Sequence, residues 1–392
     1  MNIIFFEEDR EQFLPLTFTR TVADLRVGIL TIREKWENQL SIKTSSKTIE
    51  YLSKKYPIHF KDNVDNIWIN ASVFPNEKLL TEIKNLKANE VLLDSNTTIA
   101  ANTGSNTNFE AANTTNFICK QTNSVITKLD RITDIFSKNE LAIQQDFDFL
   151  TKGRSSQKLS STNTIIGNNI FVEEGAKVEA AILNSTSGPI YIGAAAEIME
   201  GTLVRGPLAL CEHATLKLGT KIYGATTIGP HSKVGGEVTN SVVLGYSNKG
   251  HDGFLGNSII GEWCNLGADT NNSNLKNNYA EVKLWNYKTE KLERTGLQFC
   301  GLIMGDHSKC GINTMFNTGT VVGVFANIFG GNFPPNFIPS FSWGGSSGFE
   351  TYRTDKAFEV AGQVMSRRGL DLTNTDKNLL LKIFELTKKY RK

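Results

Sequence analysis

The sequence of 392 residues predicts an α/β domain, a parallel β-helix and a helical C-terminal tail, in that order. Three observations lead to this fold class. Apolar runs alternate with a helix-like pattern over residues 1–150, aliphatic residues recur at every sixth position over residues 164–345, and helical periodicity returns within residues 346–392. The polar stretch TKGRSSQKLSSTN, residues 151–163, is typical of a linker between the first two parts.

The first part contains the elements of an α/β unit. Residues 2–6, NIIFF, predict a buried strand, and residues 67–69 and 91–93 are further strand candidates. Helix-like spacing predicts a helix over residues 21–40, through Val22, Leu25, Ile29, Ile32 and Trp36. Residues 95–116 are rich in Asn, Thr and Ser, which predicts a polar loop or an irregular strand pair. The alternation of strands and helix favours an α/β fold.

The second part has a period of six that an α-helix cannot keep on one face. Small residues, often Ala, Thr or Ser, stand four places after most aliphatic residues, as the interior of a narrow parallel β-helix requires. The aliphatic positions are Ile192, Ile198, Val204, Leu210, Leu216, Ile222, Ile228 and Val234. The same phase holds at Ile166, Val172 and Val178, at Phe254, Ile260 and Leu266, and at Met304, Cys310, Phe316, Val322 and Ile328.

Two breaks interrupt this period. The first spans about residues 237–253 and contains Lys249, His251 and Asp252 close together. The second, residues 271–296, alternates apolar and charged residues and predicts a protruding hairpin. Because loops that leave a rigid solenoid tend to carry binding groups, both breaks are candidate functional segments. In contrast, Cys264 occupies a small-residue position of the repeat and is expected to fill the core.

The C-terminal tail has helical periodicity over residues 354–367 and 375–391, separated near Gly369. We expect these helices to cap the β-helix or to contribute to contacts between subunits.

Composition narrows the classes of function. The formal net charge of +2 gives no basic surface for nucleic acid or for an acidic membrane. No apolar stretch approaches the roughly 20 residues of a membrane span, and the start, MNIIFFEEDR, is unlike a secretory signal. Neither a disulfide framework nor a zinc site is predicted by the scattered cysteines Cys119, Cys211, Cys264, Cys300 and Cys310. We therefore expect a cytoplasmic protein.

Residues 14–36, LPLTFTRTVADLRVGILTIREKW, resemble the signature of sugar-1-phosphate nucleotidyltransferases at Pro15, Leu16, Thr17, Arg20 and Lys35. The resemblance implies a nucleotidyltransferase-like α/β domain with Mg²⁺ as cofactor. Fixed cations suit this chemistry because they offset charge on the attacking and leaving phosphates. The candidate nucleotide- and phosphate-binding residues are accordingly Arg20, Arg26 and Lys35.

This first part departs from the signature at three places. FEEDREQF, residues 6–13, stands where a glycine-rich phosphate loop is expected. Val22 occupies the usual position of a lysine, and Asn70 that of an aspartate that would coordinate Mg²⁺. The candidate metal ligands are therefore Asn70 and Asp94, with Asp146 as a further possibility.

Both parts together resemble the bifunctional N-acetylglucosamine-1-phosphate uridyltransferase/glucosamine-1-phosphate acetyltransferase family, most closely a divergent branch of it. The resemblance rests on residues 18–37, on NKGHDGFLGNSIIGEWCNLGADTNNSNLKNN at 248–278 and on GDHSKCGINTMFNTGT at 305–320. It implies a left-handed β-helix, a homotrimer with sites between subunits, and acetyl-CoA and UTP as co-substrates. The product would be UDP-N-acetylglucosamine for the bacterial cell envelope.

The same resemblance assigns roles within the β-helix. His251 matches the catalytic histidine, which would take a proton from the sugar amine as the amine attacks the thioester. Lys249 or Lys276 would hold the sugar phosphate as a point charge. The remaining matches are Asn265 and the pair Asn278 and Tyr279, whereas Phe254 replaces a tyrosine of the family.

Three alternatives remain open. The N-terminal domain could be degenerate, so that only the acyltransferase is active. The β-helix could instead carry a metal-dependent carbonic anhydrase, which needs three converging imidazoles. His213 and His231 lie one coil apart and could stack on one face, but that geometry also suits a harmless surface ladder; His59 and His307 are isolated in sequence. A purely structural solenoid is the third alternative.

Overall fold

The computed structural model describes residues 1–61, 63–105 and 109–391. The chain divides into two compact units, residues 1–13, 19–25 and 30–132, and residues 14–18, 26–29 and 133–392. The second unit thus contains residues 133–150, which we expected in the N-terminal domain, and two short segments of the signature. Within the predicted polar loop 95–116, residues 106–108 lie outside the described residues.

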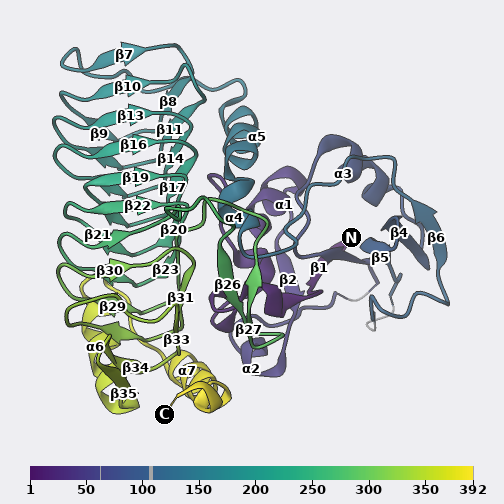
Figure 1. The fold of residues 1–392 in the computed structure, drawn as a ribbon. Helices are drawn as coiled ribbons and strands as arrows, with labels where there is room; N and C mark the ends of the chain where they lie inside the picture. The colour runs from purple at the N-terminus through teal and green to yellow at the C-terminus, as the bar shows by residue number, and fades with distance from the viewer. Residues whose placement is uncertain (62, 106–108, 392) are drawn as a thin grey trace. The chain divides into compact units, whose positions relative to one another are not determined.

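The first unit is built on a six-stranded sheet with the order β2-β1-β3-β5-β4-β6 (Figure 1). Only β5 runs antiparallel to its neighbours. The strands predicted at 2–6, 67–69 and 91–93 are confirmed as β1, β3 and β4. The strand bounds are β1 Asn2–Phe6, β2 Thr44–Lys47, β3 Asn66–Asn70, β4 Glu90–Asp94, β5 Thr97–Asn102 and β6 Ile118–Gln121.

The helices of this unit are short. They are η1 Arg10–Phe13, η3 Val22–Asp24, α1 Ile32–Leu40, α2 Glu50–Ser53 and α3 Glu77–Lys84.

The predicted helix over 21–40 is wrong in its first half, since only α1 is an α-helix there. Thr31 caps α1 through a capping box with Glu34, which fixes where the helix begins. Just before it, Gly28 has φ +81°, and a Cβ at this position would approach the Ala142 carbonyl carbon to 2.7 Å. The apolar spacing of the segment therefore reflects burial in irregular backbone rather than a continuous helix.

The second unit contains a parallel β-helix whose strands stack in three sheets (Figure 1). The first face comprises β7 Thr164–Ile166, β10 Ile182–Asn184, β13 Leu203–Arg205, β16 Lys221–Tyr223, β19 Glu237–Thr239 and β22 Phe254–Gly256. Below β22, next to it, β25 Asn271–Asn272 pairs with β30 Met315–Phe316.

The second face comprises β8 Ile170–Val172, β11 Ile190–Ile192, β14 Leu208–Leu210, β17 Thr226–Ile228, β20 Val242–Gly245, β23 Ile259–Glu262, β28 Leu302–Met304, β31 Thr320–Val322 and β33 Phe337–Ile338. The third face comprises β9 Lys177–Val178, β12 Glu197–Ile198, β15 Thr215–Leu216, β18 Lys233–Val234, β21 Asn248–Lys249, β24 Asn265–Leu266, β29 Lys309–Cys310, β32 Asn327–Ile328 and β34 Ser342–Gly345. It ends in β35 Gly348–Thr351, which is antiparallel to β34.

The period of six corresponds to the interior of this β-helix. The eight aliphatic residues from Ile192 to Val234 are each at most 3 % exposed and belong to one hydrophobic core. Their small partners, such as Ala214 and Thr220, are fully buried. Each strand hides its backbone edges against the coils above and below, so the repeat explains both the burial and the pairing.

Three details of the predicted phase are wrong. Ile166 is 42 % exposed, and Leu255 rather than Phe254 pairs with the core residue Val238. The first break does not exist as a loop, because β19, β20 and β21 lie within residues 237–253. Here the coils are shorter: fifteen positions separate the register partners Val234 and Lys249, whereas eighteen separate Leu216 and Val234.

The remaining elements frame this β-helix. The hairpin predicted within residues 271–296 is present as β26 Lys283–Asn286 and β27 Lys291–Arg294. The predicted tail helices are present as α6 Thr354–Ser366 and α7 Asn374–Leu386, and they pack through Phe358 on Phe325 and through Phe384 on Phe341. The other helices are η2 Leu16–Phe18, α4 Asp134–Ser137, α5 Asn139–Thr151 and η4 Lys388–Tyr390. Among the described residues, helices long and apolar enough to cross a bilayer are absent.

Candidate functional site

His251 lies on a four-residue turn, residues 250–253, that joins β21 on the third face to β22 on the first face. We call this segment the His251 turn. Its two central residues, His251 and Asp252, are exposed, whereas the strands on either side are mostly buried. The turn therefore presents an imidazole and a carboxyl group to solvent from a rigid scaffold, as a general base requires.

Lys249 lies at the core position of β21, in register with Val234 of the coil above, and is only 3 % exposed. Its Nζ donates hydrogen bonds to the carbonyl oxygens of Gly235 at 3.2 Å, His251 at 2.9 Å and Asp252 at 3.2 Å. Burial lowers the pKa of the ammonium group to about 8, against the opposing effect of nearby acidic groups. Lys249, one of the two lysines that we expected to hold the sugar phosphate, is thus a buried group that binds backbone.

Glycines bring the His251 turn close to the coils on both sides. Gly236 has φ +77°, and a Cβ there would lie 3.0 Å from the His251 carbonyl oxygen. Gly253 has φ +110°, and a Cβ there would lie 2.2 Å from the Thr270 carbonyl oxygen. Larger residues at these two positions would push the turn away from its neighbours.

Asn265 lies on β24, one coil beyond β21 on the third face, in register with Asn248. Its Oδ1 accepts a hydrogen bond of 3.0 Å from Asn248 Nδ2. Asn265 is half-buried, and it lies on the coil next to the His251 turn.

The other predicted acyltransferase residues lie on the segment that follows β25. Lys276 Nζ donates to the Glu281 carbonyl oxygen at 2.8 Å, and Asn278 Oδ1 accepts from the Ala280 amide at 3.1 Å. Tyr279 is 66 % exposed and has φ +54°. His251 comes just before the first-face strand β22, whereas these residues come after the neighbouring strand β25. The two groups therefore lie on opposite sides of the first face, one where its strands begin and the other where they end.

An aromatic stack, which the sequence only hinted at, follows one corner of the β-helix. The rings of His213 and His231 are parallel with centroids 4.8 Å apart, which confirms the stacked arrangement considered for them. The stack continues through Tyr246, Trp263, His307, Phe325 and Phe341, all at positive φ. Within the described residues, groups of three or more His, Cys, Asp or Glu suited to a metal ion are absent. The arrangement therefore favours a structural ladder over a carbonic anhydrase centre.

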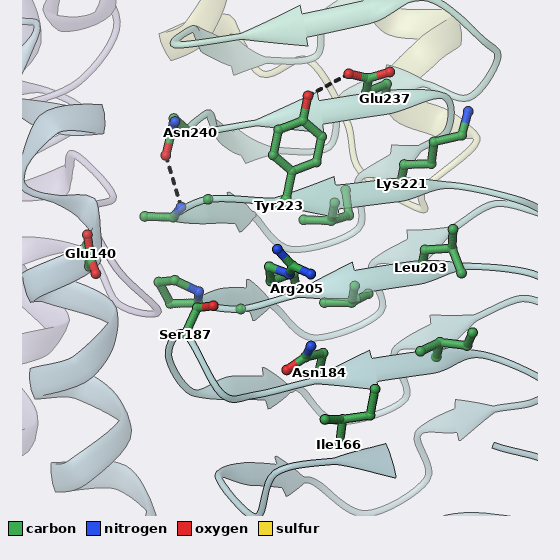
Figure 2. Close-up of a pocket in the computed structure, with 17 residues that line it drawn as sticks. Glu140, Ile166, Asn184, Ser187, Leu203, Arg205, Lys221, Tyr223, Glu237 and Asn240 are labelled. Atoms are coloured by element: carbon green, nitrogen blue, oxygen red, sulfur yellow. Dashed lines mark hydrogen bonds between the residues drawn. The ribbon is translucent and has the colours of Figure 1, made fainter. Parts of the chain in front are cut away.

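A groove of about 700 Å³ lies on the first face of the upper coils, beside α5 (Figure 2). Outward-pointing Ile182 and Leu203, each at least 40 % exposed, line it together with Arg205. The Tyr223 hydroxyl donates to Glu237 at 2.5 Å, and this hydrogen bond raises the pKa of Tyr223 to about 12. Sequence reasoning missed this groove, although apolar residues at outward positions between the core residues were a usable signal.

The first unit buries two of its predicted phosphate-binding cations. Arg20 and Lys35 are each 3 % exposed, and Lys35 Nζ lies 5.4 Å from the ring centre of Phe74. At the end of β1, Glu7 accepts hydrogen bonds from the Val22 amide at 2.7 Å and from the Thr48 hydroxyl at 2.5 Å. Burial raises the pKa of Glu7. An acidic side chain thus takes up a backbone donor in the segment expected to bind phosphate.

Arg26, the third predicted cation, belongs to the second unit. Its guanidinium donates to the Ile29 carbonyl oxygen and lies 3.9 Å from Cys211 Sγ on the β-helix. The Ile29 amide donates to Asp146 Oδ2 at 2.8 Å, which gives Asp146 a structural role in place of the considered metal ligation. Within the second unit, residues 26–29 therefore contact α5 and the β-helix.

The predicted Mg²⁺ ligands do not fit a metal site. Asn70 Oδ1 accepts hydrogen bonds from the Ser72 amide at 3.1 Å and the Ser72 hydroxyl at 2.8 Å, and Asn70 Nδ2 donates to Glu8 at 3.0 Å. Asp94 ends β4, which is separated from β3 by β5, so roughly two strand spacings, about 10 Å, lie between the two residues. A metal at Asn70 would have to displace its existing hydrogen bonds.

Known proteins are similar in sequence both to the N-terminal domain and to a longer part of this chain. Residues 3–155 match the sugar nucleotidyl transferase family. The chain is 33 % identical over 118 residues to the "Bifunctional protein GlmU" of Methanocaldococcus jannaschii, which covers 30 % of this chain and 26 % of that protein. It is 25 % identical over 227 residues to the "Bifunctional sugar-1-phosphate nucleotidylyltransferase/acetyltransferase" of Sulfurisphaera tokodaii, covering 53 % of this chain and 55 % of that protein. The matches thus span about a quarter to just over half of the relatives' lengths.

Among known structures, the chain is 13 % identical to an Arabidopsis UDP-N-acetylglucosamine acyltransferase, with a TM-score of 0.26 and coverage of 54 % of this chain and 77 % of that chain. This score is too low to support an inference, and the assignment of the β-helix rests on its strand pairing. Residues 3–155 therefore carry a sugar nucleotidyl transferase domain, joined in one chain to a hexapeptide-repeat parallel β-helix.

Proposed function

We propose that this protein is a bifunctional sugar-phosphate transferase of UDP-N-acetylglucosamine synthesis. The β-helix transfers an acetyl group from acetyl-CoA to glucosamine-1-phosphate, and the N-terminal domain transfers a nucleotidyl group from UTP to the acetylated sugar phosphate. The match of residues 3–155 and the bifunctional relatives support this proposal. The observation that carries the acetyl transfer is the exposed His251 on a turn that buried groups hold in place.

In the acetyl transfer, His251 acts as the general base. Its neutral imidazole takes a proton from the sugar amine while the amine nitrogen attacks the thioester carbonyl carbon. A carbon–nitrogen bond forms and the carbon–sulfur bond breaks. The proton held by His251 then passes to the leaving thiolate, so that coenzyme A departs as the thiol and the imidazole is neutral again. The half-buried Asn265 on the next coil is the candidate donor to the tetrahedral oxyanion.

We further propose that the acetyl-transfer site forms between copies of the chain in a homotrimer. His251 and the segment with Lys276, Asn278 and Tyr279 lie at opposite ends of the first face of one chain. A neighbouring copy could bring its own Tyr279, which is 66 % exposed, toward His251. The half-buried Lys276, in place of Lys249, would then supply the positive charge that holds the sugar phosphate.

For the nucleotidyl transfer, Arg20 and Lys35 remain the proposed cations. A second candidate function, an acetyltransferase whose N-terminal domain has lost catalysis, is favoured by one specific observation. Glu7 accepts from the Val22 amide and Glu8 accepts from the Asn70 side-chain amide, so both carboxylates take up donors that phosphate oxygens of a nucleotide would otherwise use. Asn70, the expected Mg²⁺ ligand, is already bound to Glu8 and to the Ser72 amide.

Two assays on the purified full-length chain test the proposal. Release of the coenzyme A thiol is measured with acetyl-CoA and glucosamine-1-phosphate, and we expect turnover that depends on both substrates. Pyrophosphate release is measured with UTP, Mg²⁺ and N-acetylglucosamine-1-phosphate. Thiol release without pyrophosphate release from any common nucleoside triphosphate would select the second candidate, and absence of thiol release would overturn the acetyl transfer.

A further inference from the structure

Lys249 occupies a position that most other coils of the third face fill with aliphatic side chains. Its register partner is Val234, and the core residue of the next coil is Leu266. A charged residue in such a core is costly unless polar partners surround it. Its presence therefore calls for a specific reason in the structure around it.

The partners of Lys249 provide that reason. The ammonium group donates to two consecutive carbonyl oxygens of the His251 turn, those of His251 and Asp252, and to Gly235 of the coil above. The Asp252 carbonyl also accepts from the Asp269 amide at 3.1 Å. The ammonium group thus holds the turn by hydrogen bonds from inside the β-helix. The Asp269 amide of the next coil adds a further hydrogen bond to it.

The charges around this group favour its protonated form. The carboxylates of Asp252 and Asp269 and the thiol of Cys310 are the titratable groups that act on it, and burial opposes them. Gly235, Gly236 and Gly253 leave the turn little room to move toward either neighbouring coil. Removal of the ammonium group would leave the carbonyl oxygen of the buried Gly235, and that of His251, without this donor.

We propose that Lys249 is a positioning residue for His251: its buried ammonium group fixes the peptide carbonyls of the His251 turn and thereby the direction of the imidazole. This inference rests on the proposed function, because it gives Lys249 a role in acetyl transfer through His251. It replaces the phosphate-binding role expected for this lysine. Substrate binding does not involve Lys249 directly, so its loss affects turnover rather than affinity.

The test uses the full-length variant Lys249→Met, which keeps the length of the side chain and suits a core position. We expect kcat for acetyl transfer to fall at least tenfold, while KM for acetyl-CoA stays within threefold. Lys249→Gln retains one donor group, and we expect an intermediate kcat. The matched control is Val234→Met, the same core position one coil away, for which kcat should stay within twofold. An unchanged kcat in Lys249→Met would overturn the proposal.

A second measurement separates this inference from the proposed function. Amide hydrogen exchange of residues 250–254 should be at least tenfold faster in Lys249→Met than in the wild type, and unchanged in Val234→Met. Unchanged exchange in Lys249→Met would overturn the positioning role whatever reaction the protein catalyses. Faster exchange in a protein that releases no coenzyme A thiol would uphold the anchoring of the turn and reject the acetyl transfer.

Discussion

At the His251 turn a buried cation binds backbone acceptors, whereas at the end of β1 two acidic side chains bind the donors that surround them. Lys249 meets three carbonyl oxygens from inside the β-helix, and His251 stays exposed above it. Glu7 meets the Val22 amide, and Glu8 meets the Asn70 side chain. The first arrangement leaves the His251 imidazole accessible to a substrate. The second occupies hydrogen-bond donors that a phosphate group would need.

A sequence motif can therefore be present where its side chains are already engaged with other groups of the protein. The signature of the N-terminal domain is present, but it contributes Arg26 to the second unit and buries Arg20 and Lys35. In the β-helix the repeat is irregular around His251, and this irregular coil presents the His251 imidazole to solvent.

The largest effect is expected from Gly253→Ala. The backbone has φ +110° there, and the new Cβ would lie 2.2 Å from the Thr270 carbonyl oxygen, so the His251 turn has to move. Because a displacement of about 1 Å near the reacting atoms costs roughly a hundredfold in rate, we expect a loss of this order in thiol release. Gly250→Ala is the control in the same turn, since its nearest neighbour is the side chain of Asn248 at 3.0 Å. Equal activity of both variants would contradict a rigid turn.

Lys249 should also make stability depend on pH. Its pKa in the folded protein is lowered to about 8, so the unfolded chain holds more protons between about pH 8 and about 10.4. The free energy of unfolding of the wild type should therefore rise with pH in this window relative to Lys249→Met, by at most about 1.4 kcal/mol per pH unit. Urea unfolding of both proteins at pH 7.5 and 9.5 measures the difference. A difference that does not change with pH would mean that Lys249 keeps its proton.

A smaller effect is expected at the end of β1. Glu8→Gln keeps the acceptor for Asn70 but removes a negative charge. If the N-terminal domain binds UTP, calorimetric titration should show affinity rising by roughly threefold to tenfold, about 1 kcal/mol. Exposed Glu77→Gln at the start of α3 is the control and should leave affinity unchanged. A lack of UTP binding by all three proteins would support a domain without nucleotide chemistry.

The smallest effect is expected in the aromatic stack. His213 is exposed and stacks on His231 at 4.8 Å, so His213→Ala should change acetyl transfer less than twofold. Metal analysis of the wild type by mass spectrometry should find no stoichiometric zinc. Bound zinc that is lost in His213→Ala would instead revive the metal-dependent alternative.

The sequence predicted those parts of the fold that follow from a local period. The aliphatic residues from Ile192 to Val234 fill the core because each coil of eighteen residues repeats the same three strands. The prediction from the period was wrong where the coils are shorter. The coil from Val234 to Lys249 is three residues shorter than the one before it, which changes the spacing of core residues without ending the β-helix. The helix over 21–40 failed because Gly28 meets backbone from a distant segment, which no local pattern reveals.

The candidate site was predictable in residue type but not in role. His251 was singled out by its place at a break of the repeat and by its match to a catalytic histidine, and the structure places it exposed on a turn. Lys249 was expected, with Lys276 as the alternative, to hold the sugar phosphate as a point charge. Lysines are seldom buried, and only the three carbonyl oxygens around Lys249 explain why this one is. Asn70 likewise needed its contacts with Ser72 and Glu8 before its fitness as a metal ligand could be judged.

The rate of coenzyme A thiol release by His251→Ala, compared with that of the wild type at saturating acetyl-CoA and glucosamine-1-phosphate, tests the central claim most directly. Since His251 is exposed, the variant should keep the circular dichroism spectrum and the elution volume of the wild type. We expect a loss of roughly 10²–10⁴-fold in kcat, the contribution of a general base. A variant that retains the wild-type rate within about fivefold would contradict the assignment of His251 as that base.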